Sequence, residues 1–292
     1  MNKELLIKLY KINSPSKREN KMRSFIIRYV KTMKDVRIQS DKIGYIYLTK
    51  GESESYPALV AHMDEVHNIR GEREIIELKG ILFGYSMKDM KQVGIGADDK
   101  NGIWIALEAL RTLPALKVLF TVQEEIGAVG ASYASVKFFD DCRFVLECDR
   151  KGNSDIITSI YHEKICSDEF LYDIKPIFKS YGYSKNNGLL TDVAELRDNN
   201  LNLSCVNISC GYYNPHTDEE YTVLKDLQNC LEMVLEICRS VTNTYLYENH
   251  KFYNYYNDSF GGFMCDVCSS MDCGNCPYYS KEGIKYDLYE KK

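Results

Sequence analysis

The sequence of 292 residues lacks several features that would place it in a specialised class of protein. It contains no run of roughly 18 to 20 apolar residues, which a membrane-spanning helix requires. Its net charge is −5, so we predict neither nucleic acid nor a membrane as a partner. The opening residues are charged and lack the apolar segment of a signal peptide, from which we expect a cytoplasmic protein.

The motifs of three large enzyme classes are also missing. "HEKIC" at 162–166 lacks the second histidine of a zincin, and no G-x-S-x-G elbow of an α/β-hydrolase occurs. "GIGADD" at 94–99 lacks the third glycine of a dinucleotide-binding loop. What remains is an ordinary globular composition, 45% hydrophobic and 27% charged, in a chain long enough for a large core.

The hydrophobic pattern predicts an α/β protein. Helical spacing covers residues 3–12 and 17–33, and Ser16 with Glu19 forms a capping-box pattern before the second of these helices. Residues 36–51 are typical of a β-hairpin, and further β-structure is expected over 72–87. Helices are predicted over 102–113 and over 216–241.

Four short apolar runs are predicted to be buried strands: 58–62, 117–125, 143–149 and 203–209. Strands that alternate with helices imply an α/β sheet, whose reactive groups gather at the carboxyl ends of the strands. Histidines and acids stand near these ends, or at turns that open helices: His62, Asp64, Asp98, Asp99, Glu124, Glu125, Asp149 and His216. Each alone is typical of a surface charge or a helix cap, but together they favour a pair of zinc-like ions with a general base.

The order of six motifs resembles the co-catalytic di-zinc exopeptidases, the group that includes tripeptidase T and the glutamyl aminopeptidases. The matching segments are "NSPSKREN", "AHMDEV", "GADDKNG", "TVQEEIGAVGA", "TDVAEL" and "NISCGYYNPHTDEEY", within residues 1–244. This resemblance implies a three-layer α/β/α fold with a mixed, mostly parallel central sheet. It also implies two divalent ions, zinc or alternatively cobalt or manganese.

The resemblance assigns a role to each matched residue. His62 and Asp149 would bind one metal, Glu125 and His216 the other, and Asp98 would bridge both, through a cis peptide to Asp99. Asp64 would hold the imidazole of His62, and Glu124 would be the general base. Glu147 stays an alternative ligand, because it lies on the same face of the same strand as Asp149. The resemblance favours Asp149, since related aminopeptidases have aspartate at this position and related carboxypeptidases have glutamate.

The chain departs from its relatives in having no room for a lid domain. Only 36 positions separate His62 from Asp98, and 67 separate Asp149 from His216. We therefore expect a lidless catalytic domain over 1–244, with substrate-binding groups supplied by Tyr212, Tyr213 or the aromatic tail. Closure by a partner subunit in a homo-oligomer would also supply them. Thr191 and Asp192 are either near the site or the start of a helix.

Eleven cysteines need a separate interpretation. Seven are dispersed in apolar patterns and are expected to be reduced, since no export signal is seen. The other four, Cys265, Cys268, Cys273 and Cys276, lie in a C-terminal appendage over 245–292. Their number suits one structural zinc, while paired disulfides, an iron–sulfur cluster and an unstructured tail stay open.

Three functions are compatible with this pattern. The first is metal-dependent hydrolysis of a small peptide by an aminopeptidase or related exopeptidase. The second is deacylation or deacetylation of an N-acyl amino acid on the same scaffold, because fold does not fix substrate. The third is an inactive binding protein, which would be expected to lack some of the ligands.

Overall fold

The computed structural model describes residues 1–69, 71–127 and 130–247. All of these residues fall in the first of the two compact units into which the chain divides, Met1–Phe252. The predicted boundary between residues 244 and 245 stays a prediction. Tyr245 nevertheless packs in this first unit, because it is buried and its backbone pairs with Arg143 and Ser204.

The α-helices are α1 (Lys3–Lys11), α2 (Asn20–Val30), α3 (Ala97–Thr112), α4 (Asp168–Ser180), α5 (Asp192–Asp198) and α6 (Leu224–Ser240). Three short 3-10 turns, η1 (Glu124–Ile126), η2 (Ala131–Tyr133) and η3 (Val136–Phe139), follow the seventh strand. The strands are β1 (Val36–Ser40), β2 (Ile46–Lys50), β3 (Tyr56–His62), β4 (Glu74–Leu78), β5 (Ile81–Ser86), β6 (Lys91–Val93), β7 (Leu116–Thr121), β8 (Cys142–Arg150), β9 (Asp155–Ile160), β10 (Glu163–Lys164), β11 (Ser184–Gly188), β12 (Cys205–Ser209), β13 (Tyr212–Tyr213) and β14 (Tyr221–Val223).

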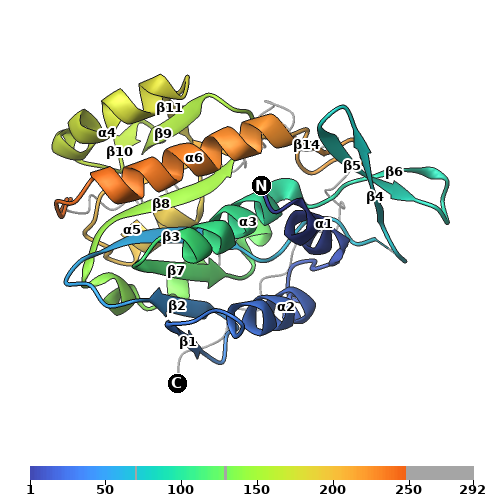
Figure 1. Cartoon of the computed structure of the whole chain (residues 1–292), viewed down its shortest axis with the longest axis horizontal. Coiled ribbons are helices and arrows are strands. Elements are labelled where there is room, and N and C mark those ends of the chain that lie inside the picture. Colours follow the sequence, from blue (N-terminus) through green and yellow to red (C-terminus); the bar gives the residue numbers. More distant parts are fainter. Residues whose placement is uncertain (70, 128–129, 248–292) are drawn as a thin grey trace, which may run out of the picture. The chain divides into compact units, whose positions relative to one another are not determined.

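A nine-stranded mixed sheet forms the centre of the unit, with the strand order β1-β2-β7-β3-β8-β12-β9-β10 and β11 beside β9. Its four middle strands, β7, β3, β8 and β12, run parallel. Every residue of β3 and β7 is buried, as expected of strands that are covered on both faces. Figure 1 shows α3 and α6 in front of these strands and α5 behind them. The predicted α/β/α architecture is confirmed.

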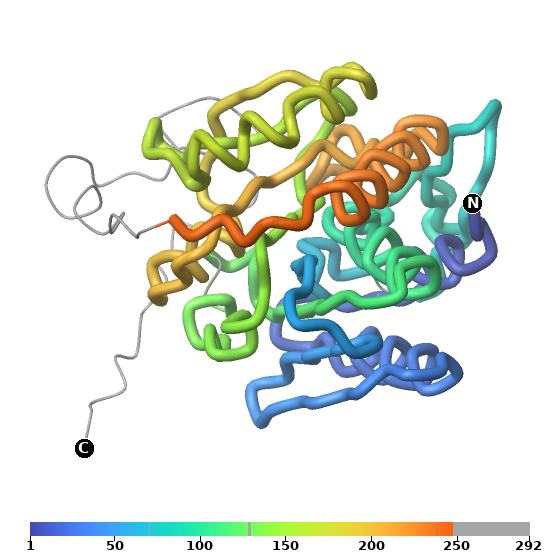
Figure 2. Tube along the Cα trace, turned by 60° about the vertical axis from the view of Figure 1, so that its left-hand side comes forward, coloured from blue at the N-terminus to red at the C-terminus, as the bar shows by residue number. Residues whose placement is uncertain are grey.

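Helix α6 runs beside α3, as Figure 2 also shows. Both helices turn an apolar face toward the sheet: α6 buries Leu227, Leu231 and Val234 at helical spacing. Helix α1 packs on α3 and buries Leu6, Leu9 and Tyr10. This packing fixes the start of α3, which carries the "GADDKNG" motif, against the carboxyl edge of the sheet.

A second sheet occupies most of the segment between His62 and Asp98. Strands β4, β5 and β6 form two successive hairpins there, and β14 with β13 joins them from far along the chain, in the order β13-β14-β5-β4 with β6 beside β5. The predicted β-structure over 72–87 is thus confirmed. The sequence did not show that it forms a sheet of its own with residues that follow His216.

Two predicted helix starts are wrong. The helix expected from residue 216 begins at Leu224, because 221–223 pair with β5 instead. The predicted capping box at Ser16 and Glu19 does not form, since α2 begins after Glu19 and the Ser16 hydroxyl donates to Asp64. Among the described residues, no helix is long and apolar enough to cross a membrane.

Candidate metal centre

Three neighbouring strands end at the same edge of the large sheet and carry most of the predicted ligands. Strand β3 ends at His62, and β8 carries Asp149 one residue before its end. Strand β7 ends at Thr121, and a left-handed residue, Gln123, then turns the chain into η1 with Glu124 and Glu125. Because parallel strands present their carboxyl ends together, residues far apart in sequence meet here.

Asp98 lies between the two predicted histidines. One of its carboxylate oxygens, Oδ1, is 3.0 Å from Nε2 of His62, and the other, Oδ2, is 3.3 Å from Nε2 of His216. The peptide bond between Asp98 and Asp99 is cis, as the resemblance implied. A carboxylate that offers a different oxygen to each imidazole has the arrangement of a bridging ligand.

Each histidine has a further acidic neighbour. Glu125 Oε2 lies 2.9 Å from Nε2 of His216, and Asp149 Oδ2 lies 3.8 Å from Nε2 of His62. Two overlapping groups have ligand atoms close enough to hold an ion, one made of His62, Asp99 and Asp149 and the other of His62, Asp98 and Glu125. The five predicted ligands therefore come together, and their roles as ligands stay predictions.

Asp64 connects His62 to the glutamate turn. Its Oδ1 lies 3.4 Å from Nδ1 of His62 and accepts a hydrogen bond from the N–H of Glu124 at 3.0 Å. Its Oδ2 accepts from the N–H of Glu125 at 3.2 Å and from the hydroxyl of Ser16 at 2.7 Å. A buried carboxylate behind a ligating imidazole fixes the ring and its tautomer.

Glu124 is placed beside the cluster without being bonded into it. Its Oε2 lies 4.0 Å from Nε2 of His62, and its side chain keeps 15% of its exposure. Burial and the charge of Asp149 raise its pKa well above the usual range, although the charge of His62 acts in the opposite direction. A partly exposed carboxylate with a raised pKa suits proton transfer near neutral pH.

The cluster carries an excess of negative charge that cations would relieve. Burial and the charge of Asp98 raise the pKa of Glu125 to about 7 and that of Asp149 to about 6. Burial alone would lower the pKa of His216, but the charges of Glu125 and Asp98 outweigh it and raise that pKa to about 12. Oε1 of Glu125 is buried and has no hydrogen-bond donor among the described residues. Oxygen and imidazole ligands of this kind fit divalent cations.

Glu147, the alternative to Asp149, faces a different partner. Its Oε2 accepts a hydrogen bond from the hydroxyl of Thr191 at 2.7 Å, whereas Asp149 faces His62. Asn207 holds the backbone of Asp149 in place, since its side chain bonds both the N–H and the carbonyl of that residue. The geometry favours Asp149 as the ligand.

The four residues proposed for the substrate pocket separate into two groups. Tyr212 donates from its hydroxyl to Oδ1 of Asp149 at 3.2 Å, while Tyr213 turns away and donates to Asp226 at 2.7 Å. Thr191 precedes α5, but its hydroxyl donates to Glu147 rather than capping the helix. Asp192 is buried and accepts from the hydroxyl of Thr121, so three of the four lie in the network behind the cluster.

Sequence reasoning missed three residues that support the cluster: Ser16, Asn207 and Glu220. Ser16 contacts Asp64 across 48 positions, Asn207 contacts Asp149 across 58, and Glu220 contacts Asp98 across 122, so no local pattern indicates these contacts. Glu220 does belong to the "HTDEEY" motif, which could have drawn attention to it.

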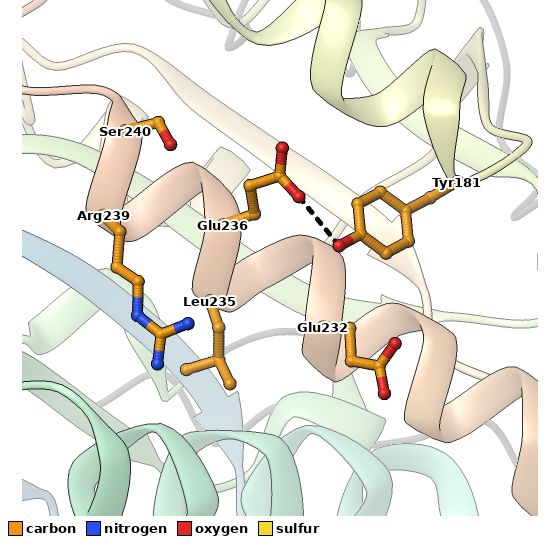
Figure 3. Close-up of a pocket in the computed structure, with 6 residues that line it drawn as sticks. All are labelled: Tyr181, Glu232, Leu235, Glu236, Arg239 and Ser240. Atoms are coloured by element: carbon orange, nitrogen blue, oxygen red, sulfur yellow. Dashed lines mark hydrogen bonds between the residues drawn. The ribbon is translucent and has the colours of Figure 1, made fainter.

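The seven dispersed cysteines are buried and free, as predicted. The cluster of Cys265, Cys268, Cys273 and Cys276 lies outside the described residues. A separate cavity of about 230 Å³ lies along α6 and is lined by Tyr181, Glu232, Leu235, Glu236, Arg239 and Ser240 (Figure 3). None of the predicted site residues lines it.

Residues 85–165 match the model of the M42 glutamyl aminopeptidase family. No curated protein sequence matches the chain. Among solved structures, the aminopeptidase PepT from Bacillus cereus aligns with a TM-score of 0.69 and 14% identity, over 82% of this chain and 99% of that chain. A tripeptidase from Staphylococcus aureus aligns with a TM-score of 0.64 and 15% identity, over 81% and 96% of the two chains.

The TET1 peptidase of Pyrococcus horikoshii, which assembles into a tetrahedron or an octahedral shell, aligns with a TM-score of 0.58 and 17% identity, over 80% and 98% of the chains. At these sequence identities the superpositions are evidence for a shared fold alone. The chain therefore has the fold of these peptidases, as its motifs predicted, and residues 85–165 carry the sequence pattern of the M42 glutamyl aminopeptidases.

Proposed function

We propose that this protein is a metal-dependent aminopeptidase that cleaves small peptides. The observation that carries the proposal is the position of Asp98 between the imidazoles of His62 and His216, with Glu125 and Asp149 on either side. The match to the M42 glutamyl aminopeptidase model supports a peptidase. The convergence of all five predicted ligands argues against an inactive binding protein.

His62 and Asp149 would hold one divalent cation, and Glu125 and His216 the other, with Asp98 shared. When bound, such a pair lowers the pKa of water and polarises the scissile carbonyl. Two imidazoles and three carboxylates are ligands that zinc accepts, and cobalt and manganese fit the same set. Zinc is our proposal for the native metal, and the further structural zinc at the C-terminal cysteines stays a prediction.

Glu124 would move the proton. Its carboxylate lies at the partly exposed side of the cluster, and its raised pKa suits it to accept a proton from water and pass it to the leaving amine. Asp64 holds both the imidazole of His62 and the backbone of Glu124, so it fixes the base relative to the ligands. Tyr212 donates to Asp149 and keeps that carboxylate oriented.

The substrate class and the assembly follow from the relatives and not from the site itself. One neighbour is named an aminopeptidase and the other a tripeptidase, and we propose the cleavage of small peptides for the present chain as well. The TET1 peptidase forms closed shells, which supports a homo-oligomer for this chain as well. The cytoplasmic location stays a prediction.

Replacing Glu124 with glutamine tests the proposal. We expect Glu124→Gln to bind as much metal as the wild type while its kcat on a dipeptide with a free N-terminus falls by a factor of about 10² to 10⁴, because general-base catalysis is lost. Metal content by mass spectrometry and steady-state kinetics measure the two effects. Glu54→Gln, at an exposed position, is the control.

A panel of substrates separates the two enzymatic functions. Amino-acid p-nitroanilides and free dipeptides would be cleaved by an aminopeptidase, whereas a deacylase would prefer N-acyl amino acids. Hydrolysis by Glu124→Gln at close to the wild-type rate would exclude Glu124 as the general base. Turnover of N-acyl amino acids alone would replace the aminopeptidase by the deacylase.

A further inference from the structure

Glu220 is a fully buried carboxylate that has no place in the ligand set. It lies four residues after His216, in the short segment that leads into β14. Its Oε2 accepts hydrogen bonds from the N–H groups of Ile95 at 2.8 Å and of Gly96 at 2.6 Å. Its Oε1 accepts from the N–H of Asp98 at 3.2 Å. Three backbone donors of one turn therefore converge on one side chain.

A histidine completes this arrangement. Nε2 of His67 lies 3.1 Å from Oε2 of Glu220, and its ring is almost completely buried. His67 follows His62 by five positions, on the loop after β3. The ring of His67 also explains why residue 94 is a glycine, because a Cβ atom at this position would lie 2.0 Å from the imidazole. The "GIG" sequence thus allows the turn to approach the His67–Glu220 pair closely.

Glu220 consequently connects the three segments that carry the central ligands: 62–67 with His62, 95–98 with Asp98, and 216–220 with His216. We propose that Glu220 is the positioning residue of the metal centre, holding Asp98 at the point where its two oxygens face the two imidazoles. The inference rests on the proposed function, because it assumes that these residues bind the metals.

The contacts require a carboxylate. An ionised glutamate only accepts hydrogen bonds and has about four lone-pair positions, which matches three N–H donors and an imidazole. Glutamine has one acceptor oxygen, and its NH₂ group only donates. With that oxygen at the Oε2 position, a glutamine would keep the hydrogen bonds from the N–H groups of Ile95 and Gly96. Its NH₂ group would then face the N–H of Asp98, and two donors cannot bond to each other. The substitution is therefore expected to disturb the bridging residue in particular.

Glu219 provides a matched control. It is the adjacent residue, is exposed, and would lose the same charge on replacement by glutamine. Both variants lose one negative charge, and only Glu220→Gln also loses the buried contacts. Wild type, Glu220→Gln and Glu219→Gln would each be stripped of metal and titrated with Zn²⁺ by calorimetry and with Co²⁺ by visible absorption, which reports ligand geometry.

We expect Glu220→Gln to bind Zn²⁺ about 10- to 100-fold more weakly than the wild type, the usual effect of removing a residue that orients a ligand. Its Co²⁺ spectrum should also change, and its kcat should fall at saturating metal with little change in KM. Glu219→Gln should match the wild type in every respect. A variant that only loses thermal stability, with wild-type Zn²⁺ affinity and Co²⁺ spectrum, would overturn the inference.

A milder variant covers the case in which Glu220→Gln does not fold. His67→Ala removes one of the four partners of Glu220 and leaves the backbone contacts, so we expect a smaller but measurable loss of Zn²⁺ affinity. Wild-type affinity in His67→Ala would then overturn the inference. A wild-type protein that binds no divalent ion would overturn the proposed function as well, whereas wild-type binding in Glu220→Gln would overturn the inference alone.

Discussion

At the scale of single residues, the convergence of the candidate ligands could be predicted and the residues that support them could not. His62, Asp98 and Glu125 stand in short motifs that favour metal chemistry only when they are taken together. Ser16, Asn207 and Glu220 are ordinary polar residues, and each acquires its role from a partner that only folding brings near. The choice between Asp149 and Glu147 also needed coordinates, because both side chains project from the same face of β8.

Neighbouring tyrosines offer a test at this scale. Successive side chains of a strand point to opposite faces, so Tyr212 reaches Asp149 while Tyr213 reaches Asp226. Tyr212→Phe removes one hydrogen bond to a proposed ligand, worth roughly 0.5 to 1.5 kcal/mol. We expect kcat/KM to fall by a factor of about 2 to 10, since each 1.4 kcal/mol is tenfold.

Tyr213→Phe is the matched control for this measurement. It loses its bond to Asp226, on the far side of the strand, and should retain the wild-type kcat/KM. Equal kcat/KM values for Tyr212→Phe and Tyr213→Phe would contradict the role given to Tyr212, whether both values fell, rose or stayed at the wild-type level.

At the scale of elements, the long periodic segments were predicted well and the non-local pairings were not. The strands that end at His62 and Asp149 were expected within a few residues of where they lie. The acidic run after His216 was predicted to lie in the helix over 216–241. The structure uses Glu220 to bind the Asp98 turn instead, and 221–223 complete a sheet with β5, more than 130 positions earlier.

Buried polar contacts hold these distant elements together, and one of them can be tested through Tyr10. Its hydroxyl, on α1, donates to Asn101 of α3 and contacts Thr222 of β14 at 2.8 Å. Asn101 in turn donates to the carbonyl of Cys210 at 2.9 Å. The phenol of Tyr10 thus links α1, α3 and strand β14 of the second sheet.

Tyr10→Phe should lower the free energy of unfolding by about 1 to 3 kcal/mol, because it leaves buried polar groups with fewer partners. Denaturant unfolding measures this difference. Tyr172, which is 78% exposed, gives the control variant Tyr172→Phe, for which no change beyond about 0.5 kcal/mol is expected. A loss in Tyr10→Phe no larger than in Tyr172→Phe would show that the phenol does not stabilise the junction.

At the scale of the whole molecule, the fold concentrates acidic groups at one edge of its sheet beyond what the protein itself neutralises. Asp98, Glu125 and Asp149 share two imidazoles, and Glu124 lies beside them. The metal-free protein therefore retains protons on this cluster. Burial and the charge of Asp98 raise the pKa of Glu125 to about 7. The charges of Glu125 and Asp98 outweigh the effect of burial on His216 and raise its pKa to about 12.

Binding of metal must displace these protons, because imidazole coordinates only in its neutral form and carboxylates only when ionised. The pKa of His62 is also raised, since hydrogen bonds to the carboxylates and the charge of Asp149 outweigh its burial. Because the pKa of both imidazoles is raised, we expect loading of two Zn²⁺ ions at pH 7 to release about two protons or more. Affinity should then rise as pH rises from 6 to 8.

Calorimetric titration of the metal-free protein with Zn²⁺ at pH 7, in two buffers with different ionisation enthalpies, counts the released protons directly. His162→Gln, which removes an exposed histidine that is not one of the proposed ligands, should release the same number as the wild type. His216→Ala should release fewer, because one imidazole no longer has to lose its proton. Zinc binding without proton release would mean that the imidazoles are already neutral in the metal-free protein. A release that is unchanged in His216→Ala would mean the same for His216, and either result would contradict the raised pKa of the cluster's imidazoles.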